Sequence, residues 1–109
     1  MFYSFPLESD ELILKKGMAT LQSGDVTSIG ALYLTTGRLV FVGYMRTAIT
    51  SGLELEIPLV HIDSLNEQKT LYVLNNGVEV ATIRGDRIRI IFTDRSGWLE
   101  AIQKQMTKL

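Results

Sequence analysis

The sequence predicts a mainly β domain in which about seven short antiparallel strands are followed by one C-terminal α-helix. Apolar and polar residues alternate with period two over most of the chain, which is the pattern of half-buried strands. Glycine-bearing turns interrupt this alternation repeatedly. After Asp94 the apolar residues recur at helical spacing instead. No repeat, low-complexity tract or charge block divides the 109 residues, so we expect a single domain over 1–109.

The first half of the chain contains the best-defined hairpin. We expect a first strand over 11–23, with a bulge or kink at Gly17 because glycine weakens a regular strand. Residues 30–35 and 38–44 then form two strands, which the tight Thr36-Gly37 turn joins.

The second half predicts four more strands, over residues 53–59, 62–74, 78–84 and 87–93. A loop over 46–52 precedes them. Pro58 marks the end or edge of its strand, because proline cannot donate a ladder hydrogen bond. The sequence Asn75-Asn76-Gly77 predicts one hairpin turn, and Gly85-Asp86 predicts another.

The last segment changes to a helical period. Asp94 or Ser96 is placed to cap its N-terminus. The residues that recur at helical spacing are Trp98, Ile102, Gln105, Met106 and Leu109. Seven short strands leave open edges, and the helix must bury its apolar stripe. We therefore expect a strongly bent sheet, one opening of which is closed by this helix and its Trp98.

The central hairpin also carries a family resemblance. Residues 30–41, GALYLTTGRLVF, resemble the G-x-L-Y-L-T-x-x-R-L-V-F core of GRAM domains, and residues 57–62, IPLVHI, resemble the I-P-L-x-x-I segment that follows it. The resemblance extends over roughly residues 9–108. It implies a pleckstrin-homology-like partial barrel of about seven antiparallel strands capped by one helix, and a module that binds lipids or proteins.

The same motif has a structural explanation of its own. Thr35 and Arg38 flank the turn, where side-chain hydrogen bonds can hold the register of the hairpin. Leu34, Leu39 and Phe41 supply apolar side chains for a core. We therefore interpret the motif as mainly structural.

Composition argues against several classes of function. The chain has no cysteine and only one histidine, His61, which are too few nitrogen and sulfur ligands for structural zinc. Its formal net charge of −1, without a basic stripe, argues against nucleic acid as a partner. We expect no metal and no cofactor. Without a membrane-spanning apolar run or a signal peptide, the expected location is the cytoplasm, including the periphery of a membrane.

Three arginines are candidates for contact with lipids. Arg46, Arg84 and Arg87 lie in or beside the loops after the third and sixth strands, which join one rim if the predicted fold is correct. Each basic residue beside an anionic leaflet is worth about 1 kcal/mol. Asp25 and Asp86 offset much of this charge, so the predicted attraction to an anionic membrane is weak.

The N-terminal segment is a candidate for contact with proteins. Phe2, Tyr3 and Phe5 make its start unusually apolar. These side chains either pack over the barrel or form a patch for a partner protein or a second copy of the chain.

The leading hypothesis is a non-catalytic module that binds a partner protein or its own copies, and weak binding of anionic lipids is the alternative. A small-ligand enzyme is a remote third hypothesis, for which Tyr33, His61 and Asp63 are candidates by residue type alone. Glu54 and Glu56 fit a solvated strand edge better than an acid–base pair. No residue is therefore predicted to be catalytic.

Overall fold

The computed structural model describes residues 5–24, 26–43, 52–70 and 74–109. Within these ranges the chain forms the expected seven strands and one helix. The strands are β1 Ile13–Ser23, β2 Val26–Thr35, β3 Arg38–Gly43, β4 Gly52–Pro58, β5 Ile62–Thr70, β6 Leu74–Thr82 and β7 Arg87–Phe92. A short 3₁₀ turn, η1, covers Leu59–His61, and the helix α1 covers Arg95–Met106.

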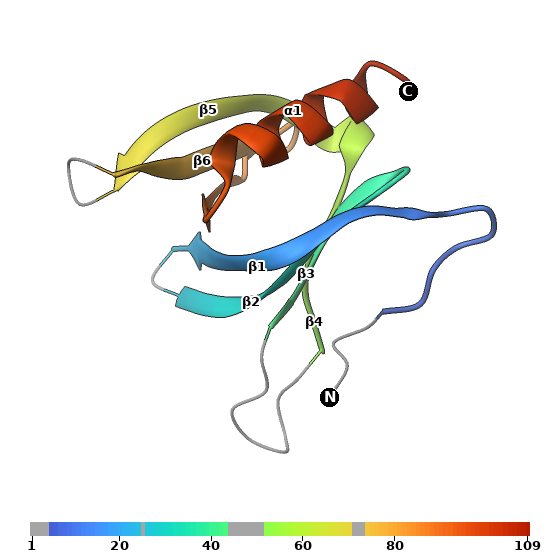
Figure 1. Ribbon diagram of the computed structural model, residues 1–109, viewed down its shortest axis with the longest axis horizontal. Coiled ribbons are helices and arrows are strands. Elements are labelled where there is room, and N and C mark those ends of the chain that lie inside the picture. The colour runs from blue at the N-terminus through green and yellow to red at the C-terminus, as the bar shows by residue number, and fades with distance from the viewer. Residues whose placement is uncertain (1–4, 25, 44–51, 71–73) are drawn as a thin grey trace.

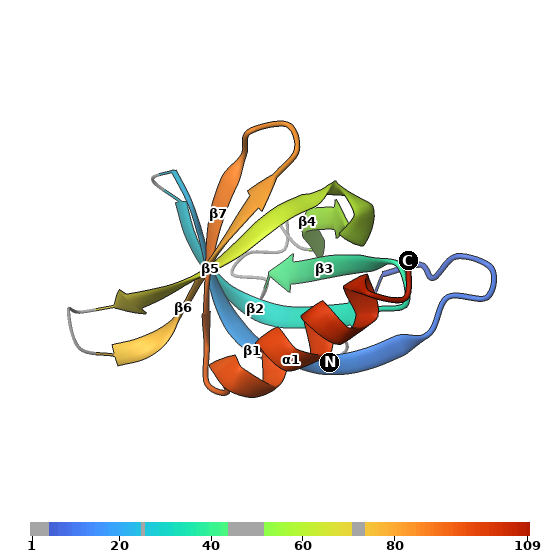
Figure 2. The same cartoon turned by 90° about the horizontal axis from the view of Figure 1, so that it is seen from above.

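The seven strands form one antiparallel sheet in the order β4-β3-β2-β1-β7-β6-β5. The central strand β1 pairs with β2 along its length and with β7 through residues 19–22. Figures 1 and 2 show that the sheet bends sharply, so that the β1–β4 part and the β5–β7 part enclose a common interior and α1 runs along one opening. The predicted partial barrel with a C-terminal helical cap is thus confirmed.

Trp98 closes the barrel as expected. Its side chain is 3% exposed and stacks on Phe92, with 5.5 Å between the ring centroids. The Lys15 ammonium lies 5.3 Å from the centre of the indole ring. The interior that this ring covers is mainly apolar, and its largest fully buried members are Phe41, Leu32, Leu34, Leu39, Leu59, Ile90 and Ile102.

Gly17 serves a different purpose from the one predicted. It pairs regularly with Leu32, and the irregularity of β1 lies earlier, between Ile13 and Lys15. A Cβ atom at Gly17 would lie 3.5 Å from the Trp98 ring, already in van der Waals contact. The predicted bulge at Gly17 is therefore wrong, and a side chain at this position would lie against the indole of Trp98 without a clash.

The helix begins and ends close to its predicted bounds. Asp94 is its N-cap, because the Asp94 carboxylate accepts a hydrogen bond of 3.1 Å from the Gly97 backbone N–H. Leu109 is 57% exposed, because the helix ends at Met106 before this residue can turn toward the sheet. No helix in the described ranges is long and apolar enough to cross a membrane.

The predicted hairpin turn at residues 75–77 is wrong. These residues lie inside β6, where Gly77 pairs with Ile91 of β7. The β5–β6 connection itself lies outside the described residues. Val78 and Val80 are fully buried, and burial of this face sets the register of β6 in spite of the local preference of Asn-Gly for a tight turn.

The hairpin motif is structural in the way expected. Thr35 is fully buried, and its hydroxyl oxygen accepts hydrogen bonds from the backbone N–H groups of Gly37 (3.2 Å) and Arg38 (3.0 Å). Gly30 is required by close packing, since a Cβ there would lie 2.3 Å from the carbonyl oxygen of Val42. These contacts hold β2 and β3 in register.

A largely buried ion network fastens the segment before β1 to this hairpin. The Arg38 guanidinium donates to the Glu11 carboxylate through Nε (2.7 Å) and Nη2 (2.8 Å), and it also pairs with Glu56 of β4. The Thr35 hydroxyl donates to Glu11 Oε2 at 2.5 Å. These hydrogen bonds, led by those from Arg38, lower the pKa of Glu11 to about 2, although burial opposes them. The same pairing raises the pKa of Arg38.

Candidate functional site

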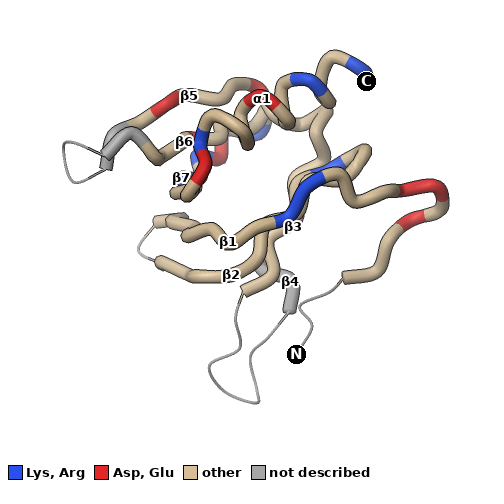
Figure 3. Tube along the Cα trace, in the orientation of Figure 1, with Lys and Arg blue, Asp and Glu red and all other residues tan. Residues whose placement is uncertain are grey.

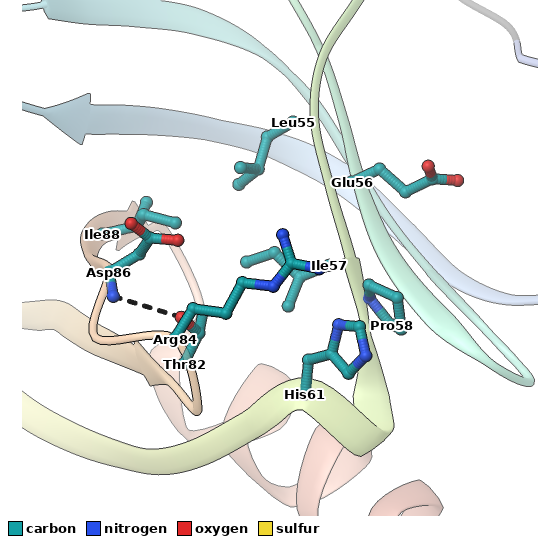
Figure 4. A pocket seen from close by; sticks show the side chains of 9 residues that line it. All are labelled: Leu55, Glu56, Ile57, Pro58, His61, Thr82, Arg84, Asp86 and Ile88. Atoms are coloured by element: carbon teal, nitrogen blue, oxygen red, sulfur yellow. Dashed lines mark hydrogen bonds between the residues drawn. The ribbon is translucent and has the colours of Figure 1, made fainter.

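A cleft opens between the edge strand β4, η1 and the β6–β7 turn (Figure 4). Its volume is about 260 Å³. The apolar part of its lining is Leu55, Ile57, Pro58 and Ile88. The polar part is Glu56, His61, Thr82, Arg84 and Asp86. A volume just below that of pockets for drug-sized ligands suits a compact polar group.

The β6–β7 turn has a well-defined local structure. The Gly85 N–H donates to the Thr82 carbonyl (2.9 Å), and the Asp86 N–H donates to the Thr82 hydroxyl (3.2 Å). Gly85 adopts a φ of +94°, a left-handed conformation that side chains disfavour. Arg84 therefore extends from a tight turn, and the hydrogen bonds between Thr82 and the two residues after Arg84 hold the backbone of this turn in place.

The opposite wall of the cleft includes η1, which is held in place by buried apolar side chains. Leu59, the first residue of η1, is 1% exposed, and Ile62, which directly follows η1, is 6% exposed. The Leu59 N–H donates to the Gly37 carbonyl at 2.9 Å. The His61 carbonyl accepts a hydrogen bond of 2.9 Å from the Ile83 N–H. This bond ties η1 to the β6–β7 turn, so His61 and Arg84 line the same cleft although they are distant in sequence.

Arg84 differs from the other arginines of the described ranges. The side chains of Arg38, Arg87, Arg89 and Arg95 all donate hydrogen bonds to protein acceptors. Among the described residues, the Arg84 guanidinium has no hydrogen bond or ion pair, and neither has the His61 ring. Figure 4 shows the Arg84 side chain extending across the cleft toward Ile57 and His61. The guanidinium donors are therefore available to a ligand.

The charges around the cleft are mixed. Glu56 is already paired with Arg38, and Figure 4 shows its carboxylate pointing away from Arg84. Asp86 lies on the side of Arg84 away from His61 (Figure 4). Figure 3 shows Lys and Arg distributed over several elements together with Asp and Glu. A cleft that combines a free guanidinium with a carboxylate suits a ligand that carries both a negative group and hydroxyl donors.

The structure describes two of the three predicted lipid-binding arginines. Arg84 lines the cleft, whereas Arg87 begins β7, is absent from the cleft lining and pairs with Glu79 at 3.1 Å with its side chain 70% exposed. Arg46 lies outside the described residues, as does the opposing Asp25. The common rim of three arginines therefore stays a prediction.

The predicted protein-binding segment is described only in part. Phe5 packs edge-on against Tyr33 on the outer face of the sheet, with 5.0 Å between the ring centroids. The Arg38 guanidinium lies 5.1 Å from the centre of the Phe5 ring. Phe2 and Tyr3 lie outside the described residues, so their role in binding a partner stays a prediction.

The residues considered for catalysis do not form one cluster. Tyr33 is buried beneath Phe5 on the outer face, whereas His61 lines the cleft and Asp63 is exposed on β5. From the sequence, His61 was considered only for the remote enzyme hypothesis, and Thr82 was not considered for binding. The only local signal for His61 was its place directly after a strand-ending proline and a short apolar pair.

Comparison with known proteins is consistent with this architecture. The C-terminal domain of an unknown protein from Leishmania infantum has a TM-score of 0.74 at 22% identity, over 89% of this chain and 85% of that chain. The Vps36 N-terminal PH domain has a TM-score of 0.71 at 14% identity, over 94% and 84%. The Slm1-PH domain in complex with phosphoserine has a TM-score of 0.67 at 12% identity, over 87% and 96%.

At these identities the solved structures establish the shared fold. No curated protein matches the sequence. The family model described as GRAM domain matches residues 1–109, which includes the hairpin motif and the segment that forms β4 and η1. The chain therefore belongs to the GRAM domain family.

Proposed function

We propose that this chain is a non-catalytic binding module whose cleft receives a phosphorylated polyol headgroup of the kind carried by inositol lipids. One observation carries the proposal. Arg84 extends into the cleft from a hydrogen-bonded turn, and its guanidinium has no partner among the described residues. A guanidinium that lines a cleft and has no protein partner there can donate hydrogen bonds to an anionic ligand.

The remaining lining suits the rest of such a ligand. The guanidinium donates to phosphate oxygens, and an N–H of the His61 ring supplies a further donor from the facing wall. The Asp86 carboxylate and the Thr82 hydroxyl accept hydrogen bonds from ring hydroxyls. Ile57 and Pro58 offer an apolar surface to the C–H groups of the ring.

Related structures support this choice of ligand chemistry. The Slm1-PH domain, which shares this fold, has been solved with phosphoserine and with D-myo-inositol 4-phosphate. Both ligands carry a phosphate monoester. Because identity is 12%, their binding residues are not transferred to this chain, and the proposal depends on Arg84 itself.

Titration of the ¹⁵N-labelled chain with D-myo-inositol 4-phosphate tests the proposal. We expect amide shifts concentrated at His61 and over residues 82–86. Arg84→Gln removes a hydrogen bond between charged groups, which is worth about 1.5–3 kcal/mol, so affinity should fall by roughly tenfold to a hundredfold.

Arg87→Gln is the matched control. It removes the same charge three residues along the chain, but Arg87 pairs with Glu79 and does not line the cleft, so the expected change in affinity is within about twofold. Equal weakening by both variants would show that general charge governs binding, and shifts confined to another surface would place the site elsewhere. Either result contradicts the proposal.

The outer face of the sheet supports a second candidate, contact with a partner protein or with another copy of the chain. Met18 and Ile29 are 57% and 45% exposed on neighbouring β1 and β2. Met18 pairs with Ala31, which belongs to the outer apolar cluster around Tyr33 and Phe5. An apolar surface that continues from a packed cluster into solvent is typical of an interaction site.

A further inference from the structure

A shallow groove runs between the helix α1 and the edge strand β5. One hollow, with a volume of about 580 Å³, is lined by residues of α1 and by Glu67 of β5. A second hollow, of about 340 Å³, is lined by Leu65 of β5 and by residues at the end of α1. Gln103 and Thr107 line both, so the two hollows form one groove alongside the helix (Figure 1). None of these residues belongs to the cleft that contains Arg84.

β5 has a free backbone edge beside this groove. The order of strands ends at β5, so within the described ranges only its β6 side has a strand neighbour. No residue of β6 lines either hollow, so the groove borders the edge of β5 that faces away from β6. Residues 64–68 pair with β6 without interruption, and a register shift bounds this run at each end. The free edge therefore has a regular stretch of limited length.

The helix forms a fixed wall of the groove. At its start, the Arg95 guanidinium donates to the carbonyls of Gln68 (3.0 Å) and Gly77 (3.4 Å). Near its end, the Gln105 side-chain amide donates to the Thr36 carbonyl at 2.8 Å. A groove between two anchored elements needs little reorganisation when a ligand enters it, which favours binding.

The two ends of the groove differ in chemistry. At one end, Leu65 and Met106 pack against the core but are only partly buried, so they leave an apolar surface for a ligand side chain. At the other end, Glu67, Glu100 and Lys104 offer charged groups of both signs. The groove therefore suits a ligand with one apolar and one polar side chain along its length.

The free edge of β5 decides what kind of ligand fits. The unpaired N–H and C=O groups of an edge strand are matched by another extended backbone. A run of five residues covers only about 17 Å, which suits a peptide segment better than a standard interface of about 800 Å² per partner. Antiparallel pairing of two β5 strands centred on Asn66 would also place Leu65 of each copy opposite Glu67 of the other. A second copy of the chain is therefore a poor occupant.

We infer that residues 64–68 of β5 bind an extended segment of a partner protein as an additional antiparallel strand, which lies against α1 and places an apolar side chain between Leu65 and Met106. Antiparallel pairing matches every other pair in the sheet. In this direction the ligand side chain two residues before the apolar one faces Glu67 and is polar. The surface is separate from the cleft and does not depend on its ligand.

Selection from random nine-residue peptides displayed on phage, with the full chain as bait, tests the inference. The enriched peptides should share an apolar residue two positions after a polar one and should lack proline between them. Bound as a synthetic peptide, the enriched sequence should slow hydrogen exchange of β5 amides within 64–68. A selection without enriched peptides, or protection confined to another surface, would contradict the inference.

Backbone methylation of the selected peptide separates strand addition from contact by side chains alone. N-methyl groups at alternate positions each remove one hydrogen bond to β5, so they should weaken binding about tenfold, whereas those at the intervening positions should change it within about twofold. Equal effects at all positions would contradict strand addition.

Two exposed positions provide the matched variants of the protein. Gln103→Trp fills the point where the hollows meet and should weaken peptide binding at least tenfold, whereas Lys108→Trp, exposed outside the groove lining, should leave it within about twofold. Equal affinities would place the peptide elsewhere. A mass that rises with concentration, together with protection of β5 amides in the absence of peptide, would assign the edge to a second copy and overturn the inference.

Discussion

The ion network around Glu11 makes the stability of this domain depend on pH in a specific way. Glu11 is only 7% exposed, and its carboxylate accepts hydrogen bonds from Arg38 and from the Thr35 hydroxyl. The pKa of Glu11 falls from its ordinary value of 4.5 to about 2, chiefly through the hydrogen bonds from Arg38. The folded state therefore favours the ionised carboxylate.

The size and sign of the effect follow from this pKa. Each tenfold change in an ionisation constant is worth 1.36 kcal/mol, so ionised Glu11 contributes about 3 kcal/mol to the free energy of unfolding. Because the folded-state pKa is the lower one, this contribution is complete above the unfolded-state value of 4.5. It is lost progressively as the pH falls from about 5 to about 2.

Urea denaturation over a range of pH checks the prediction with Glu11→Gln. Near neutral pH the free energy of unfolding of the variant should be about 3 kcal/mol lower than that of the unchanged chain, and this difference should shrink toward pH 2. Glu100→Gln is the control, because Glu100 is exposed on α1 and its side chain has no hydrogen bond or ion pair with the described residues. Its free energy of unfolding should remain within about 0.5 kcal/mol of the unchanged chain.

Two results would refute this reasoning. One is that Glu11→Gln lowers the free energy of unfolding near neutral pH by less than about 1 kcal/mol, which is the contribution of an ordinary surface ion pair. The other is a difference between Glu11→Gln and the unchanged chain that stays constant from neutral pH down to about pH 3, since a lowered pKa cannot produce it.

Gly30→Ala should lower the free energy of unfolding by about 2–3 kcal/mol in chemical denaturation, because its Cβ meets a backbone carbonyl. Gly37→Ala has no atom within 4 Å of its Cβ and should change stability by less than about 1 kcal/mol, so equal effects would contradict the packing argument. For the second candidate function, light scattering should show a mass that rises with concentration, is reduced by Met18→Ser and is unaffected by Leu109→Ser, since both residues are 57% exposed. A strictly monomeric chain at high concentration would contradict self-association.

Much of the fold could be predicted from local patterns. Alternation with period two located the strands, because a half-buried strand must place apolar residues on one face. The change to helical spacing located α1, and the size of Trp98 identified it as the residue that closes the barrel. The hydrogen-bonding role of Thr35 could be predicted from its place beside a tight turn.

Other features were inaccessible to this reasoning. The Asn-Gly sequence at residues 76–77 favours a turn, but burial of the face of β6 that carries Val78 outweighs this local preference. Glycine at position 17 signalled an irregular strand, whereas the residue pairs regularly with Leu32 and lies beside the indole of Trp98 from the far end of the chain. In both cases the deciding contact comes from a distant segment.

The candidate site shows the same division. Residue type and turn composition were enough to single out Arg84 as a basic residue on a loop of the predicted rim. Its position opposite His61 depends on the pairing of Ile62 with Thr82, which brings η1 and the β6–β7 turn together. Local periodicity specifies which side of a strand is buried, but it does not specify which distant strand lies beside it. The cleft therefore arises only when the bent sheet is assembled.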